Sequence, residues 1–145
     1  MAAGWQVQAI YVAQSGSPMA FGNVLFTGNL HDIPLPRSER TILRYFNTGA
    51  GFNTVAAQQL ANNFRTFPSY LTGARNPGWN LWAMSVIKSI RLREKVNFEV
   101  RGEAKNALNH PNWGGPNLGP TSALFGQISS ALTSRQITVQ GKLNW

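Results

Sequence analysis

The segment 96–105 constrains the fold more than any other part of the chain, because its side chains alternate between two chemical classes. Val96, Phe98, Val100, Gly102 and Ala104 are apolar or small, and they alternate with Asn97, Glu99, Arg101, Glu103 and Lys105. Successive side chains of a β-strand point to opposite faces, whereas a helix would mix the two sets around its surface. The segment therefore predicts a strand with one apolar face and one polar face.

Three further segments show the same period of two. In the last of them, Ile137, Val139, Gly141 and Leu143 alternate with polar residues, and Trp145 follows. The first segment, WQVQAIYVAQ, has one apolar face and one mixed face, and the faces of the second are the least distinct. The sequence thus predicts four strands, at 5–14, about 80–92, 96–105 and about 136–145.

The composition and the connection lengths indicate that the apolar faces of these strands contact a membrane. Only 12% of the residues are charged, whereas a soluble domain has about 25%. No stretch approaches the about 20 continuous apolar residues of a spanning helix, so any crossing must use alternating strands. A tight turn at Arg93 and Glu94 joins the second and third predicted strands, while the other connections are long. Tight turns on the periplasmic side and long loops outside are typical of outer-membrane barrels.

We therefore predict an all-β fold, an antiparallel transmembrane β-barrel segment of about four strands with long outer loops. The first loop should contain a short strand over 21–27. It should also contain one short helix, with Thr54 as its N-cap, running through Leu60 and ending at Asn62 and Asn63. A soluble edge strand can alternate in the same way. A small soluble β-rich protein that binds a carbohydrate or an anion is therefore the alternative.

The polar face of 96–105 is the first candidate site. Asn97, Glu99, Arg101, Glu103 and Lys105 should face a polar barrel lumen, as should Lys88 and Lys142. Glu99 and Glu103 could serve as a carboxylate pair for hydrolysis, but the intervening Arg101 favours neutralisation. We expect no catalytic residue and no enzyme activity.

Aromatic and basic side chains supply the other candidates. Trp5, Trp82 and Trp145 fall near predicted strand ends, where indole rings favour the membrane interface. The net charge is +8, and the first loop holds Arg37, Arg40, Arg44, Arg65 and Arg75. Solvated loop charge is the simplest explanation, while Arg37, Arg40, Arg44 and Trp113 are the possible contacts to a ligand or to lipopolysaccharide. No basic-aromatic nucleic-acid motif is present, so we expect no nucleic-acid partner.

The sequence gives little sign of a metal site. Cys is absent, which removes thiolate ligands, thiol nucleophiles and disulfides. His31 beside Asp32 has no third ligand at a recognisable spacing, and His110 precedes a proline that ends a strand. We expect neither a metal nor a cofactor.

Several longer motifs point to one family. They are GWQVQAIYVAQSGSP, FTGNLHDIPLP, RYFNTGAGF, AQQLANNFRTFP, WAMSVIKSIRL and NFEVRGEAKNALNHPNW. In these motifs the chain resembles the C-terminal portion of TonB-dependent outer-membrane receptors, especially the Oar-like group with a carboxypeptidase-regulatory-like domain. The last motif, at 97–113, is the most specific.

The resemblance implies a barrel of about 22 strands, plugged by an N-terminal domain and driven by TonB. Residues 1–145 would then be a single incomplete domain at the end of that barrel, in the bacterial outer membrane. Its partners would be the rest of the barrel, the plug, the TonB system through the N-terminal part, and lipid. The receptor would take up a nutrient such as a siderophore or an oligosaccharide, and this segment alone would transport nothing.

The start of the chain leads to a further expectation. Residues 1–4 lack a secretory signal, so we expect the chain to be incomplete at its front. A third possibility is a truncated product that does not fold independently, because open strand edges in lipid leave backbone groups unsatisfied.

Overall fold

The computed structural model describes residues 4–59 and 64–145. These residues separate into two compact units. The sheet unit comprises residues 4–14, 79–112 and 132–145, and the loop unit comprises residues 15–59, 64–78 and 113–131. No helix in the described ranges is both long and apolar enough to cross a membrane.

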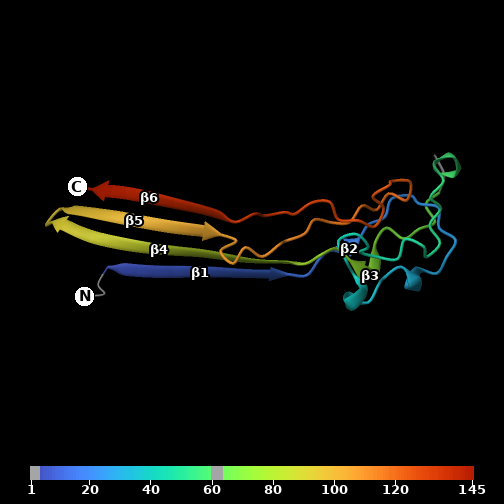
Figure 1. Cartoon of the computed structure of the whole chain (residues 1–145), viewed down its shortest axis with the longest axis horizontal. Coiled ribbons are helices and arrows are strands. Elements are labelled where there is room, and N and C mark those ends of the chain that lie inside the picture. Colours follow the sequence, from blue (N-terminus) through green and yellow to red (C-terminus); the bar gives the residue numbers. More distant parts are fainter. Residues whose placement is uncertain (1–3, 60–63) are drawn as a thin grey trace. The chain divides into compact units, whose positions relative to one another are not determined.

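The sheet unit is one antiparallel sheet of four strands in the order β1-β4-β5-β6 (Figure 1). The strands are β1 (Trp5–Gln14), β4 (Trp79–Arg93), β5 (Val96–Lys105) and β6 (Gln136–Asn144). All four predicted strands are confirmed, with β4 one residue longer at each end and β6 one residue shorter. The tight turn between β4 and β5 consists of Glu94 and Lys95, one position later than expected.

The strand register places apolar side chains from all four strands together on one face. Val7 pairs with Val86, Val86 with Gly102, and Gly102 with Val139. One position along, Gln8 pairs with Ser85, Ser85 with Glu103, and Glu103 with Thr138. Directly paired residues point to the same side of a sheet, so the sheet unit has an apolar face and a polar face.

The apolar face stays exposed in the sheet unit. Val7, Ile137 and Val139 are 65%, 68% and 72% exposed. A sheet in water would bury such residues against a second layer, whereas the lipid-facing band of a barrel leaves them open to acyl chains. The exposed apolar face is thus the expected surface of a membrane-spanning wall.

The loop unit, in contrast, has a hydrophobic core of its own. Phe21 and Phe52 contact each other, and each also contacts Phe46 and Phe67, with ring centroids 5.1–6.1 Å apart. Phe125 contacts Phe46 and Phe52. Two short strands, β2 (Pro18–Met19) and β3 (Leu71–Arg75), pair antiparallel beside this cluster and contribute Met19, Leu71 and Ala74 to it. The loop residues thus build a packed unit instead of an extended connection.

Two predictions for the first loop need correction. The strand predicted over 21–27 is absent: Phe21 is buried in the aromatic cluster, and Phe26 makes only an isolated bridge to Phe52. The described part of the predicted helix is a single 3-10 turn, η3 (Ala56–Gln58), with Val55 as its N-cap in place of Thr54. Leu60, Asn62 and Asn63 lie outside the described residues. Two further 3-10 turns, η1 (Leu30–Asp32) and η2 (Arg37–Glu39), were not predicted.

Candidate functional site

The polar face of the sheet brings together the five residues predicted to form a polar ladder. In the β5–β6 register they pair with polar residues of β6: Asn97 with Asn144, Glu99 with Lys142, Arg101 with Gln140, Glu103 with Thr138, and Lys105 with Gln136. The polar surface therefore includes residues of both β5 and β6. Whether this surface faces a lumen depends on barrel closure, so that role stays a prediction.

The central charges of this surface contact one another. Arg101 Nη1 lies 3.1 Å from Glu103 Oε1, and both side chains are more than a third exposed. An exposed ion pair contributes about 0–1 kcal/mol, so its main effect is to hold the two side chains in place. A carboxylate that is paired with a guanidinium suits contact with a solute or a protein better than it suits hydrolysis.

Arg101 also lines a hollow on this face. Glu99, Arg101, Gln140 and Lys142 surround a volume of about 230 Å³. Arg101 Nε is buried and has no hydrogen-bond acceptor among the described residues. Buried donors are normally paired, so this N–H is an exception among the polar groups of the face.

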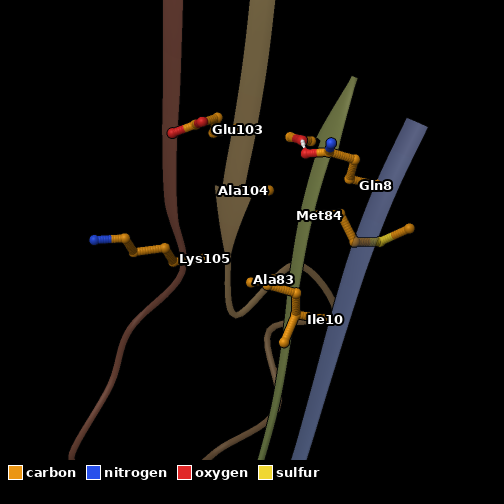
Figure 2. A pocket seen from close by; sticks show the side chains of 8 residues that line it. Gln8, Ile10, Ala83, Met84, Glu103, Ala104 and Lys105 are labelled. Carbon is orange, nitrogen blue, oxygen red and sulfur yellow. Dashed lines mark hydrogen bonds between the residues drawn. The ribbon is translucent and has the colours of Figure 1, made fainter. Parts of the chain in front are cut away.

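A second hollow of about 210 Å³ lies between β1, β4 and β5. Figure 2 shows Gln8, Glu103 and Lys105 extending to one side of the sheet and Met84 extending to the other. The small side chain of Ala83, paired with Lys105, leaves room here. Ser85 Oγ donates a 3.4 Å hydrogen bond to Gln8 Oε1 across the β1–β4 pair. Amide, hydroxyl and charged groups together could bind the polar groups of a solute or of a protein segment.

The prediction that Lys88 faces the lumen with Lys105 and Lys142 is wrong. It pairs with Trp5 and Val100, so it belongs to the apolar face. Its ammonium nitrogen lies 4.9 Å from the centroid of the Trp5 ring, in a cation–π contact. The error arose because both faces of β4 are mixed in sequence, and only its pairing with β1 and β5 reveals which face is apolar.

The three tryptophans predicted at the membrane interface lie at different heights along the strands. Trp5 begins β1 and Trp145 follows the end of β6. Trp82 is the fourth residue of β4 and stacks on Tyr11, with ring centroids 4.7 Å apart. Trp5 and Trp145 thus lie toward one end of the sheet, and the Tyr11–Trp82 pair lies toward the other. This arrangement resembles the two aromatic girdles of a barrel.

The arginines of the first loop divide into two groups. Arg65 donates to the carbonyl oxygens of Phe21, Phe67 and Pro68, and Arg75 donates to that of Gly16. Arg40 Nε donates to the carbonyl oxygen of Leu35, and its guanidinium lies over the ring of Tyr45. These three side chains therefore stabilise the loop unit. Arg37 and Arg44 are exposed and remain the better candidates for an anionic ligand.

Trp113, the fourth predicted ligand contact, lies in the loop unit, where it forms an isolated bridge with Ala131. No group of three or more His, Asp or Glu side chains that could hold a metal occurs among the described residues. His31 lies in η1, where its backbone N–H donates to Asn29 Oδ1. No geometry here assigns His31 a ligand role.

Two buried asparagines at the end of the sheet were missed as structural residues. Asn106 and Asn112 are each 1% exposed. Asn106 bonds both to His110 and to Thr133, while Asn112 Oδ1 accepts from the backbone N–H of Asn80 at 2.8 Å. Both residues belong to the motif NALNHPN. Its asparagine content could have indicated a structural role, since Asn tolerates left-handed backbone and its side chain bonds to nearby backbone groups.

Comparison with known proteins agrees with this geometry. A model of the family described as outer membrane beta barrel domain matches residues 1–138. No curated protein and no solved structure matches the chain significantly. The sheet has one apolar and one polar face, and its strands are joined by one tight turn and by long connections. These features are typical of the wall of such a barrel. The chain belongs to the outer membrane beta barrel domain family, and its location is the bacterial outer membrane.

Proposed function

We propose that this chain forms the C-terminal barrel strands of a TonB-dependent receptor of the Oar-like group. Such a receptor takes up a nutrient, such as a siderophore or an oligosaccharide, with energy delivered through TonB. The observation that carries the proposal is the charged polar face opposite the apolar face of the same sheet. Its charges are Glu99, Arg101 and Glu103 on β5 and Lys142 on β6, and Lys142 is paired with Glu99. The motifs that resemble this receptor group support the same assignment.

The chemistry of that face suits a lumen occupied by a polar solute and a plug. The Arg101 side chain is 38% exposed, and its guanidinium can donate to a carbonyl or carboxylate oxygen of a plug or a solute. The neighbouring hollow offers an ammonium and an amide from Lys142 and Gln140. Charged side chains of both signs favour several weak polar contacts with a solute over one tight binding site. A solute that must pass through the barrel requires such weak contacts.

The open edges of the sheet support a larger barrel. Within the described chain, β1 pairs only with β4, and β6 pairs only with β5. In lipid, an unpaired strand edge leaves backbone N–H and C=O groups without partners, at several kcal/mol per group. We therefore propose that further strands close the barrel, and that this segment by itself does not transport.

The test begins with the protein in its source cells. An antibody against residues 37–44 should detect an outer-membrane protein several times heavier than this chain. Deletion of its gene and deletion of TonB should each abolish uptake of the same labelled compound from a panel of siderophores and oligosaccharides. Uptake that persists without TonB would refute the receptor assignment. A soluble antigen of the size of this chain would instead favour a small binding protein for a carbohydrate or an anion.

A further inference from the structure

Lys88 is a charged residue within the apolar face of a membrane-spanning sheet. The side chains paired with it are Trp5 on β1 and Val100 on β5. A cation is costly on the lipid-facing side at the bilayer midplane, but its cost falls to a small value near the interface. The position of Lys88 along the strand therefore decides what its ammonium group can contact.

The register places Lys88 toward the periplasmic end of the sheet. It pairs with Trp5, the first residue of β1, and the backbone N–H of the next residue, Ser89, donates to Gly4 at 2.8 Å. The tight turn of Glu94 and Lys95 lies at this same end (Figure 1). Tight turns of outer-membrane barrels are periplasmic, so Lys88 lies toward the phospholipid leaflet.

Trp5 determines where the ammonium group of Lys88 lies. The Nζ atom lies 4.9 Å from the centroid of the Trp5 ring. An indole ring favours the headgroup level of a membrane, and a lysine can extend its aliphatic part along apolar surface while its charge reaches water. An ammonium group has three N–H donors. A phosphate oxygen can therefore share this ammonium with the ring and with its other partners.

We propose that Lys88 and Trp5 form a binding site for the phosphate of an anionic glycerophospholipid in the periplasmic leaflet. The ammonium donates to a phosphate oxygen, and the indole packs against the glycerol and the first acyl carbons. Val86 and Val100, which share this face, contact the acyl chains. The site depends on the outer-membrane location of the chain and not on the receptor activity proposed above.

The experiment uses the native outer-membrane protein that contains this chain. It is reconstituted in vesicles of phosphatidylethanolamine with a phosphatidylglycerol fraction and is then extracted in mild detergent. Mass spectrometry counts the phosphatidylglycerol molecules that remain bound to each protein. The variant is Lys88→Met, which keeps the length of the side chain and suits a lipid-facing position. The matched control is Lys142→Met, the same change on the polar face.

We expect Lys88→Met to weaken phosphatidylglycerol retention roughly fivefold, the factor for one basic residue at an anionic membrane surface. Lys88→Arg and Lys142→Met should retain the lipid as the parent protein does. A difference in gel mobility between unheated and heated protein checks that each variant has folded. Unchanged retention in folded Lys88→Met would overturn the site. An equal loss in Lys142→Met would also overturn it, because retention would then report net charge alone. Preferential retention of added lipopolysaccharide at Lys88 would overturn the assignment to the periplasmic leaflet.

Discussion

The side-chain amide of Asn106 donates a 3.0 Å hydrogen bond to the carbonyl oxygen of Thr133, although 27 positions separate the two residues. The same nitrogen donates to the carbonyl oxygen of His110, and Asn106 Oδ1 accepts from the His110 backbone N–H, both at 2.9 Å. Asn106 directly follows β5, and Thr133 precedes β6. One buried amide thus fixes the turn after β5 to the segment that enters β6.

Replacing Asn106 with Asp should destabilise this end of the sheet by about 2–3 kcal/mol, because a carboxylate cannot donate to the two carbonyl oxygens. Asp also tolerates the positive φ of 49° at this position, so backbone strain does not contribute to the effect. Urea unfolding of the native protein measures the effect. Asn109→Asp is the control, since Asn109 is exposed and also has a positive φ, 52°. Equal unfolding midpoints for the two variants would contradict the role of Asn106.

Phe21→Ala should unfold the loop unit while leaving the sheet unit intact. Phe21 is 1% exposed and contacts Phe46, Phe52 and Phe67. Removing such a ring costs about 3–5 kcal/mol. Limited proteolysis should then cut within 15–59, while unheated protein still migrates as a folded barrel. Phe64→Ala is the control, because Phe64 is 95% exposed. Resistance of Phe21→Ala to protease would show that the aromatic cluster does not hold the unit together.

Gly28→Ala should have a similar local effect for a steric reason. A Cβ atom at Gly28 would lie 1.7 Å from the carbonyl oxygen of Ala50, a backbone atom that cannot move aside cheaply. At Gly22 the same atom would meet nothing within 4 Å. We expect proteolysis of the loop unit to accelerate in Gly28→Ala and to stay near the parent rate in Gly22→Ala. Equal rates would contradict the close approach of these two backbone segments.

Arg65→Lys should weaken the loop unit, although the charge is kept. The guanidinium of Arg65 reaches the carbonyl oxygens of Phe21, Phe67 and Pro68, and an ammonium group cannot reproduce this fork of donors. A loss of about 1–3 kcal/mol is expected, measured as a lower temperature for protease cutting of the loop unit. Arg44→Lys, at an exposed position, should show no change. If both variants behaved alike, Arg65 would be an ordinary surface charge.

Arg37 and Arg44 lead to a functional prediction. Both are exposed, whereas Arg40, Arg65 and Arg75 are bonded to loop carbonyls. If the exposed pair contacts lipopolysaccharide phosphates, changing both to Gln should lower the affinity of the native protein for purified lipopolysaccharide by about tenfold or more. Arg91→Gln with Lys95→Gln, near the tight turn, is the charge-matched control. Equal losses in the two double variants would rule out a specific contact through the loop.

Period-two alternation predicted the strands because side-chain direction in a strand follows from backbone geometry alone. The faces of 96–105 and 136–145 could be assigned for this reason, and Glu99, Arg101 and Glu103 were correctly grouped on one side. The outer-membrane barrel class was also predictable, since alternation and connection lengths indicated it and the family match spans residues 1–138. The receptor group stays a proposal. The single interior tight turn and the long connections followed from the spacing of the strands.

Tertiary structure decided what depends on pairing between distant segments. β4 carries mixed side chains on both faces, so only its register with β1 and β5 placed Lys88 beside Trp5 on the apolar face. The core of the loop unit draws Phe21, Phe46, Phe67 and Phe125 from separate stretches with no common period. Alternation is a property of one strand and can be read locally. Burial in the loop unit, and the choice of face for an ambiguous strand, arise from contacts between segments and therefore appear only once the chain is folded.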